Sequence, residues 1–167
     1  MKRLVFLLLT LVMLATMVRP STVFAQGVTQ ISGISYWPND GECTDPEGAG
    51  ADYAVKMTGD LEGCHYTFVQ TAVCTPGGAY VETGIETFVG QFHGESGTFM
   101  TTYRFTAKYD NCTNFVEQVG RCQHPIIESS GTGIFEGATG RIDIKDDIAA
   151  GNFPYRGHLD LLTSLSP

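Results

Sequence analysis

The segment Ser130–Leu162, SGTGIFEGATGRIDIKDDIAAGNFPYRGHLDLL, indicates the fold of this chain most clearly. Its glycines recur at intervals typical of tight turns, where positive φ angles or close backbone contacts are needed. Between them, Ile134, Ile142 and Ile144 keep the period of two that marks half-buried strands. The pattern predicts the closing hairpins of a β-barrel.

Similar alternations run through the rest of the chain and are separated by Gly, Pro, Asn and Asp clusters. In residues 97–109, Phe99, Tyr103, Phe105 and Tyr109 share one face, and the other face is mostly polar. No segment after residue 25 predicts an amphipathic helix. We therefore predict an all-β, eight-stranded antiparallel β-barrel of the calycin-like kind, because closure removes exposed strand edges. The predicted strands cover residues 27–37, 54–58, 61–73, 79–92, 97–109, 115–119 and 155–163, with shorter ones between residues 126 and 144.

The N-terminus has the features of a secretory signal peptide. Lys2 and Arg3 precede an apolar run over residues 4–17, and Val23-Phe24-Ala25 is an acceptable cleavage site. The run is shorter than the roughly 20 residues of a membrane-spanning helix. We predict a signal peptide over residues 1–25 and a single barrel domain over residues 26–167, secreted or periplasmic and free of the membrane after cleavage.

The predicted mature chain is strongly acidic. Three of the ten basic residues fall in the signal peptide, which leaves seven against eighteen acidic residues and a formal charge near −11. A basic surface, which binding to phosphates requires, is absent from the sequence. Nucleic acid is therefore not an expected partner, and no cofactor is predicted.

All five cysteines lie in the predicted exported part, where disulfides persist. Two bridges and one free thiol allow about 15 arrangements. We predict a bridge between Cys112 and Cys122, because the intervening segment contains Asp and Asn residues typical of a loop that bends back. A second bridge would come from Cys43, Cys64 and Cys74.

Thiols and imidazoles are close in sequence at Cys64-His65 and at Cys122-Gln123-His124, and both groups are zinc ligands. Adjacent strand residues point to opposite faces, however, so Cys64 and His65 are poorly placed to share an ion. We predict no metal site. His93 and His124 adjoin Gly94 and Pro125, and we expect both in loops at the surface.

Residues 79–92 place Tyr80, Glu82 and Glu86 on one face of a strand. If this face pointed inward, burial and mutual repulsion would raise the pKa of at least one glutamate, giving a general acid or base. The opposite face, with Val81, Ile85 and Val89, is more apolar. We therefore expect that face to form the core and both glutamates to be solvated.

The motif GTGIFEGATG at residues 131–140, followed by Gly157 and His158, resembles bacterial exported relatives of the allene oxide cyclase and dirigent barrels. The resemblance covers about thirty residues specifically. It implies an eight-stranded antiparallel barrel with a cavity, often a homotrimer. It transfers no catalytic residue, because no residue-level match is found in the strands that carry catalysis in those plant proteins.

Three hypotheses on function follow. The first is a barrel that binds a small, largely apolar molecule through Tyr80, Phe99 and Tyr103, because small barrels can hold one ligand. The second is an isomerase or cyclase that uses Glu82 or Glu86 as acid or base and Tyr103 as hydrogen-bond donor. The third is a non-catalytic module whose outer face mediates oligomerisation. The orientation of the two glutamates distinguishes the second hypothesis from the others.

Overall fold

The computed structural model describes the backbone of residues 24–164 and the side chains of residues 27–162. Nearly all regular structure in this range is β, with a single short 3₁₀ helix, η1, at Pro46–Gly48. The strands are β1 (Phe24–Tyr36), β2 (Tyr53–Gly59), β3 (Leu61–Cys74), β4 (Ala79–Phe92), β5 (Glu95–Tyr109), β6 (Glu117–Pro125), β7 (Thr132–Gly133), β8 (Thr139–Lys145) and β9 (Phe153–Ser164).

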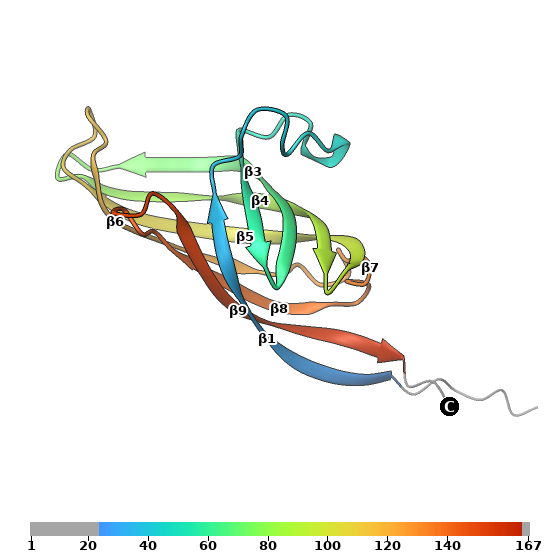
Figure 1. The fold of residues 1–167 in the computed structure, drawn as a ribbon. Helices are drawn as coiled ribbons and strands as arrows, with labels where there is room; N and C mark the ends of the chain where they lie inside the picture. Colours follow the sequence, from blue (N-terminus) through green and yellow to red (C-terminus); the bar gives the residue numbers. More distant parts are fainter. Residues whose placement is uncertain (1–23, 165–167) are drawn as a thin grey trace, which may run out of the picture.

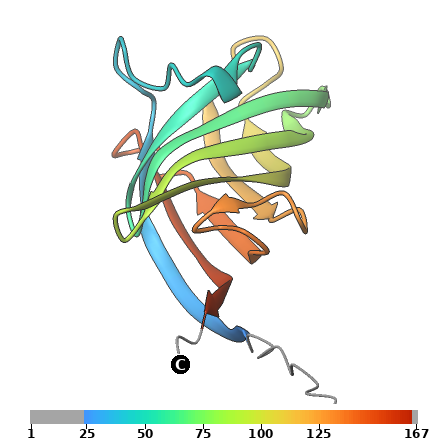
Figure 2. The same ribbon diagram turned by 90° about the vertical axis from the view of Figure 1, so that its right-hand side faces the viewer.

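Eight of these strands form a closed antiparallel barrel, which confirms the predicted fold class (Figures 1 and 2). The ring runs β1-β2-β3-β4-β5-β6-β8-β9 and closes where β9 pairs with β1. β7 is an addition of two residues at the edge of β5. Each long strand therefore pairs with the next one along the chain, which is an up-and-down topology.

The side chains of β5 alternate as predicted. Phe99 and Tyr103 are buried inside the barrel, whereas Thr102 and Arg104 are exposed. In β4 the expectation was wrong: Glu82 and Glu86 point inward and are 8% and 4% exposed, while Val81 and Ile85 lie on the partly covered outer face. Apolarity did not decide the inner face of β4, because neighbouring strands provide hydrogen-bond donors for both carboxylates.

One end of the barrel is sealed by stacked phenylalanines. Phe88 and Phe99 have ring centroids 4.9 Å apart, and the ring of Phe135 packs edge-on against Phe99 at 4.9 Å. Phe135 comes from the glycine-rich segment that we predicted to be regular hairpins. Between β7 and β8 this segment is instead a compact loop that places Phe135 in the core, and Gly133 at the end of β7 and Gly137 in the loop have positive φ angles.

Two disulfides are formed, and the predicted bridge between Cys112 and Cys122 is not one of them. Cys74 pairs with Cys112, and Cys43 pairs with Cys64. Cys122 is a buried free thiol. The prediction failed because Cys122 lies on β6 and lines the barrel interior, whereas Cys112 lies in the β5–β6 loop next to the turn that follows β3.

The Cys43–Cys64 bridge fastens the acidic loop between β1 and β2 to the outside of β3. In that loop Asp45 accepts a hydrogen bond of 2.6 Å from the Tyr66 hydroxyl. Residues 38–51 were correctly predicted to be a loop, and this loop contains η1. It covers the outer face of β3 at Cys64 and Tyr66, while His65 and Thr67 face the interior.

Residues 1–23, which include most of the predicted signal peptide, lie outside the described residues. The last two residues of the predicted peptide, Phe24 and Ala25, begin β1, which extends alongside β9 towards both chain ends (Figure 1). Between residues 24 and 164, no helix has the length and apolar character needed to cross a membrane.

Candidate functional site

A cavity of about 220 Å³ lies inside the barrel at the end opposite the phenylalanine seal. Its walls combine aromatic and ionisable side chains, and no Lys or Arg is among the described residues that line it. The aromatic residues of the wall are Trp37, Tyr53, Tyr80, Phe105, Tyr109 and Phe153. The ionisable ones besides these tyrosines are His65, Glu82, Glu86, Glu117, Cys122, His124 and Asp146.

Glu82 is surrounded by three tyrosine hydroxyls from three strands. Tyr53 and Tyr103 each donate to Oε1 over 2.8 Å, and Tyr80 donates to Oε2 over 2.5 Å. Burial, followed by the bond to this carboxylate, raises the pKa of all three tyrosines. They therefore remain protonated donors at neutral pH, and Glu82 is held as a hydrogen-bond acceptor.

Gly84 makes this arrangement possible. It pairs with Tyr103 across β4 and β5, and a Cβ atom at Gly84 would lie 2.7 Å from Cε1 of the Tyr103 ring. Because Gly84 lacks that atom, the ring can lie flat over β4 and carry its hydroxyl to Glu82. The same ring stacks on the imidazole of His124 with centroids 6.3 Å apart, so Tyr103 connects the two carboxylate clusters.

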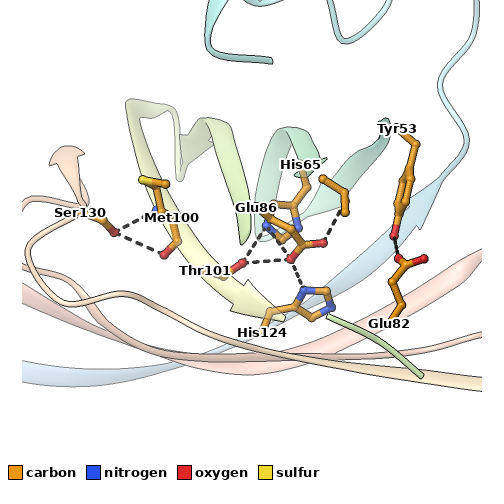
Figure 3. Close-up of polar contacts among 9 residues, drawn as sticks. Tyr53, His65, Glu82, Glu86, Met100, Thr101, His124 and Ser130 are labelled. Carbon is orange, nitrogen blue, oxygen red and sulfur yellow. Dashed lines mark hydrogen bonds and ion pairs between the residues drawn. The ribbon is translucent and has the colours of Figure 1, made fainter. Parts of the chain in front are cut away.

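Glu86 is the centre of a second cluster, deeper in the barrel (Figure 3). The two residues paired with it across the sheet are threonines: Thr67 donates to Oε1 and Thr101 to Oε2, each over 3.0 Å. His124 Nδ1 lies 2.5 Å from Oε2, and His65 Nε2 lies 3.5 Å from the same oxygen. Two imidazoles and one hydroxyl thus converge on one carboxylate oxygen.

The Glu86 cluster is almost completely dry. His65 is 0% exposed and His124 is 2% exposed. Burial by itself raises the pKa of Glu86, but the neighbouring His124 and His65 outweigh it and lower the pKa overall. Burial also lowers the pKa of His65 to about 4. At neutral pH, Glu86 is therefore an ionised carboxylate beside a neutral His65.

Each of the two histidines has one nitrogen that the network leaves unpaired. Among the described residues, neither Nδ1 of His65 nor Nε2 of His124 has a hydrogen-bond partner, and both atoms are buried. Leaving a buried polar atom without a partner costs about 1–3 kcal/mol. The cluster is thus not explained by hydrogen bonding within the core alone.

A pair of carboxyl groups, Glu117 and Asp146, lies at the cavity mouth. Partial burial, followed by a hydrogen bond and repulsion from Asp146, raises the pKa of Glu117 to about 8. Glu117 therefore keeps its proton near neutral pH. A Cβ atom on the nearby Gly120 would lie 2.2 Å from Glu117 Oε1, so this glycine leaves the space that the pair occupies.

The three residues that we predicted to bind a ligand lie in different parts of the barrel interior. Tyr80 is on the cavity wall. Tyr103 is buried and contacts Glu82 through its hydroxyl. Phe99 belongs to the phenylalanine seal, is fully buried and is not on the cavity wall, because its inward face is filled by Phe88 and Phe135.

The histidine predictions also need correction. His93 is exposed in the turn between β4 and β5, as predicted, but His124 is a buried residue of β6 and not a surface loop residue. Sequence reasoning considered His65 only with its neighbour Cys64, and those two side chains do point apart. It missed that His65 and His124, from strands far apart in the sequence, meet at Glu86.

Comparison with known proteins gives a family. Residues 34–155 match the family described as Protein of unknown function (DUF3224). The chain belongs to the DUF3224 family. The match spans the barrel from the end of β1 to the start of β9 and so includes every residue of the Glu82 and Glu86 clusters. No curated protein matches the chain.

Proposed function

We propose that this DUF3224 barrel is an exported protein that binds a small organic cation, with an aromatic or aliphatic body, in its cavity. The observation that carries the proposal is the charge of the wall: four carboxyl groups line the cavity, of which Glu117 keeps its proton near neutral pH, and no Lys or Arg among the described lining residues balances the other three. In a partly desolvated cavity, a wall that carries charges of one sign attracts ligands of the opposite charge.

The aromatic rings at the mouth support the same ligand class. Trp37 packs edge-on against Tyr53 and Phe153, with centroids 5.8 Å and 5.3 Å apart, and is 58% exposed. Cations are attracted to the faces of such rings by about 0.5–2 kcal/mol. A ligand whose charged end reaches Glu82 would therefore place its body among these rings.

The inward carboxylates also meet the geometric condition for the isomerase hypothesis, but their surroundings favour binding. Glu82 accepts three hydrogen bonds, and Glu86 has a lowered pKa. The lowered pKa makes Glu86 a weak proton acceptor, whereas general bases need a pKa near the working pH. Glu86 is therefore better suited to hold a positive charge than to move a proton.

Three probes of similar size and different charge test the proposal: phenethylamine, phenethyl alcohol and phenylacetic acid. Trp37 is the single tryptophan of the chain and lies at the mouth, so its fluorescence reports occupancy. We expect the amine to bind at least about tenfold more tightly than the alcohol, and the acid not to bind. Isothermal titration calorimetry provides the affinities.

Two matched variants each remove one glutamate charge. Glu82→Gln removes it inside the cavity, and Glu62→Gln removes it on the exposed outer face. We expect Glu82→Gln to remove the preference for the amine and Glu62→Gln to keep it. Equal affinity for the amine and the alcohol in the wild-type protein would refute the cation proposal. Tighter binding of phenylacetic acid would refute it as well.

A further inference from the structure

The Glu86 cluster has the composition and the spacing of a metal centre. One ligand atom each from His65, Glu86 and His124 lie within 4.8 Å of one another. Ligand atoms around a tetrahedral zinc ion, each about 2.0–2.2 Å from the metal, are about 3.3 Å apart. The His65–Glu86 distance of 3.5 Å already fits, and the His124–Glu86 distance of 2.5 Å would have to widen by about 1 Å.

A purely structural hydrogen-bond network explains this arrangement poorly. Thr101, His124 and His65 all approach Oε2 of Glu86. The near nitrogens of the two rings, His65 Nε2 and His124 Nδ1, therefore point towards the same carboxylate oxygen. Such convergence from β3, β4 and β6 is expected if a cation sits between the three residues.

The supporting groups and the access route also fit a metal ion. The threonines hold both oxygens of Glu86 in place, as residues around metal ligands do. All three candidate ligands line the cavity, so water or a bound molecule can take a fourth position. The acidic wall would attract a divalent cation through the mouth.

We propose that His65 Nε2, His124 Nδ1 and the Glu86 carboxylate bind a divalent transition-metal ion at the inner end of the barrel, with Zn²⁺ as the first choice. Two imidazoles and a carboxylate are a donor set that zinc uses with an open position. The site lies in the same cavity as the Glu82 cluster, but its three ligands do not include Glu82 or the tyrosines around it, so the metal proposal can be tested without the organic cation.

The first test is titration of the chelator-treated mature protein with Zn²⁺ by calorimetry, with bound metal counted by mass spectrometry. We expect one Zn²⁺ per chain. Glu86→Gln and His124→Gln should weaken binding by at least about tenfold, because loss of even a supporting residue costs about 10–100-fold. His93→Gln, which removes an exposed histidine, is the matched control and should bind as the wild type does.

The second test needs no variant and covers the case in which a buried substitution prevents folding. Wild-type protein labelled with ¹⁵N at histidine is loaded with ¹¹³Cd²⁺ and examined by NMR. We expect coupling of the metal to one Nε2 and one Nδ1, and a cadmium shift typical of nitrogen and oxygen ligands. The proposal is overturned if no metal binds, if binding persists in folded His124→Gln, or if the coupling involves His93 or the Cys122 sulfur.

Discussion

Glu82 and Glu86 are the same residue type on the same face of the same strand, yet they have different surroundings. Glu82, near the cavity mouth, accepts hydrogen bonds from three tyrosines. Glu86, four residues deeper, is held by two threonines and two histidines and is 4% exposed. The difference comes mostly from β2, β3, β5 and β6, which supply different side chains to the two positions, and Tyr80 of β4 itself adds one donor to Glu82.

This comparison shows how a barrel can build two different sites from one strand. Tyrosines surround a charge with protonated donors and leave its cavity side free for a ligand. Histidines add groups that can coordinate metals and that lie at fixed positions in a dry interior. Tyr103 touches both clusters, through its hydroxyl to Glu82 and its ring to His124.

The largest expected difference between the clusters is in the free energy of unfolding after loss of the carboxylate. Glu86→Leu would leave two histidines and two threonines unpaired in a dry site, and we expect it to destabilise the fold by about 3–5 kcal/mol. Glu82→Leu should cost about 1–3 kcal/mol, because cavity water can reach the tyrosine hydroxyls. Urea unfolding in the presence of a chelator measures both, and equal losses would contradict the distinction.

Removal of a single hydrogen-bond donor should also lower the free energy of unfolding more at the Glu86 cluster than at the Glu82 cluster, but by a smaller amount. Thr67→Val removes one buried hydrogen bond to Glu86 at nearly constant volume, and we expect a loss of about 1.5–3 kcal/mol. Tyr103→Phe removes one of three donors to Glu82 and should cost about 0.5–1.5 kcal/mol. Tyr53→Phe provides a repeat of the second change at the same oxygen.

The smallest effect is expected at Glu117, because this carboxyl group is partly exposed at the cavity mouth and solvent screens its repulsion from Asp146. Its pKa in the folded protein, about 8, lies above its ordinary value of 4.5, so the folded chain keeps a proton that the unfolded chain releases. The stability contributed by Glu117 is therefore full below about pH 4.5 and is lost as the pH rises through 8. Glu117→Gln should remove this part of the pH dependence. The measurement is the difference in the free energy of unfolding between the wild-type protein and the variant at each pH.

Several features could be predicted from the sequence because they depend on local patterns. The alternation in residues 97–109 correctly placed Phe99 and Tyr103 inside, and the run of Asn, Asp, Gly and Pro after Trp37 correctly indicated a loop. The number of strands and the absence of predicted helices led to the barrel. Side-chain period and turn chemistry act over a few residues and can therefore be recognised without the fold.

The candidate site could not be predicted in the same way. The apolar character of Val81 and Ile85 suggested that their face was the core, but the donors that make the opposite face suitable for burial come from β2, β3, β5 and β6. The adjacency of Cys64 and His65 drew attention to a pair that points apart. The disulfide partners likewise depend on which loops lie together at the barrel mouth.

The sequence by itself therefore determined the class of fold, the strand faces with strong alternation and the acidic character of the protein. Only the tertiary structure decided that two glutamates face inward, that His65 and His124 meet at Glu86, and that Cys122 remains unpaired. The reason is physical. A buried charge is tolerable only where partners surround it in three dimensions, and closure of the barrel brings together partners that are 15 to 38 residues away along the chain.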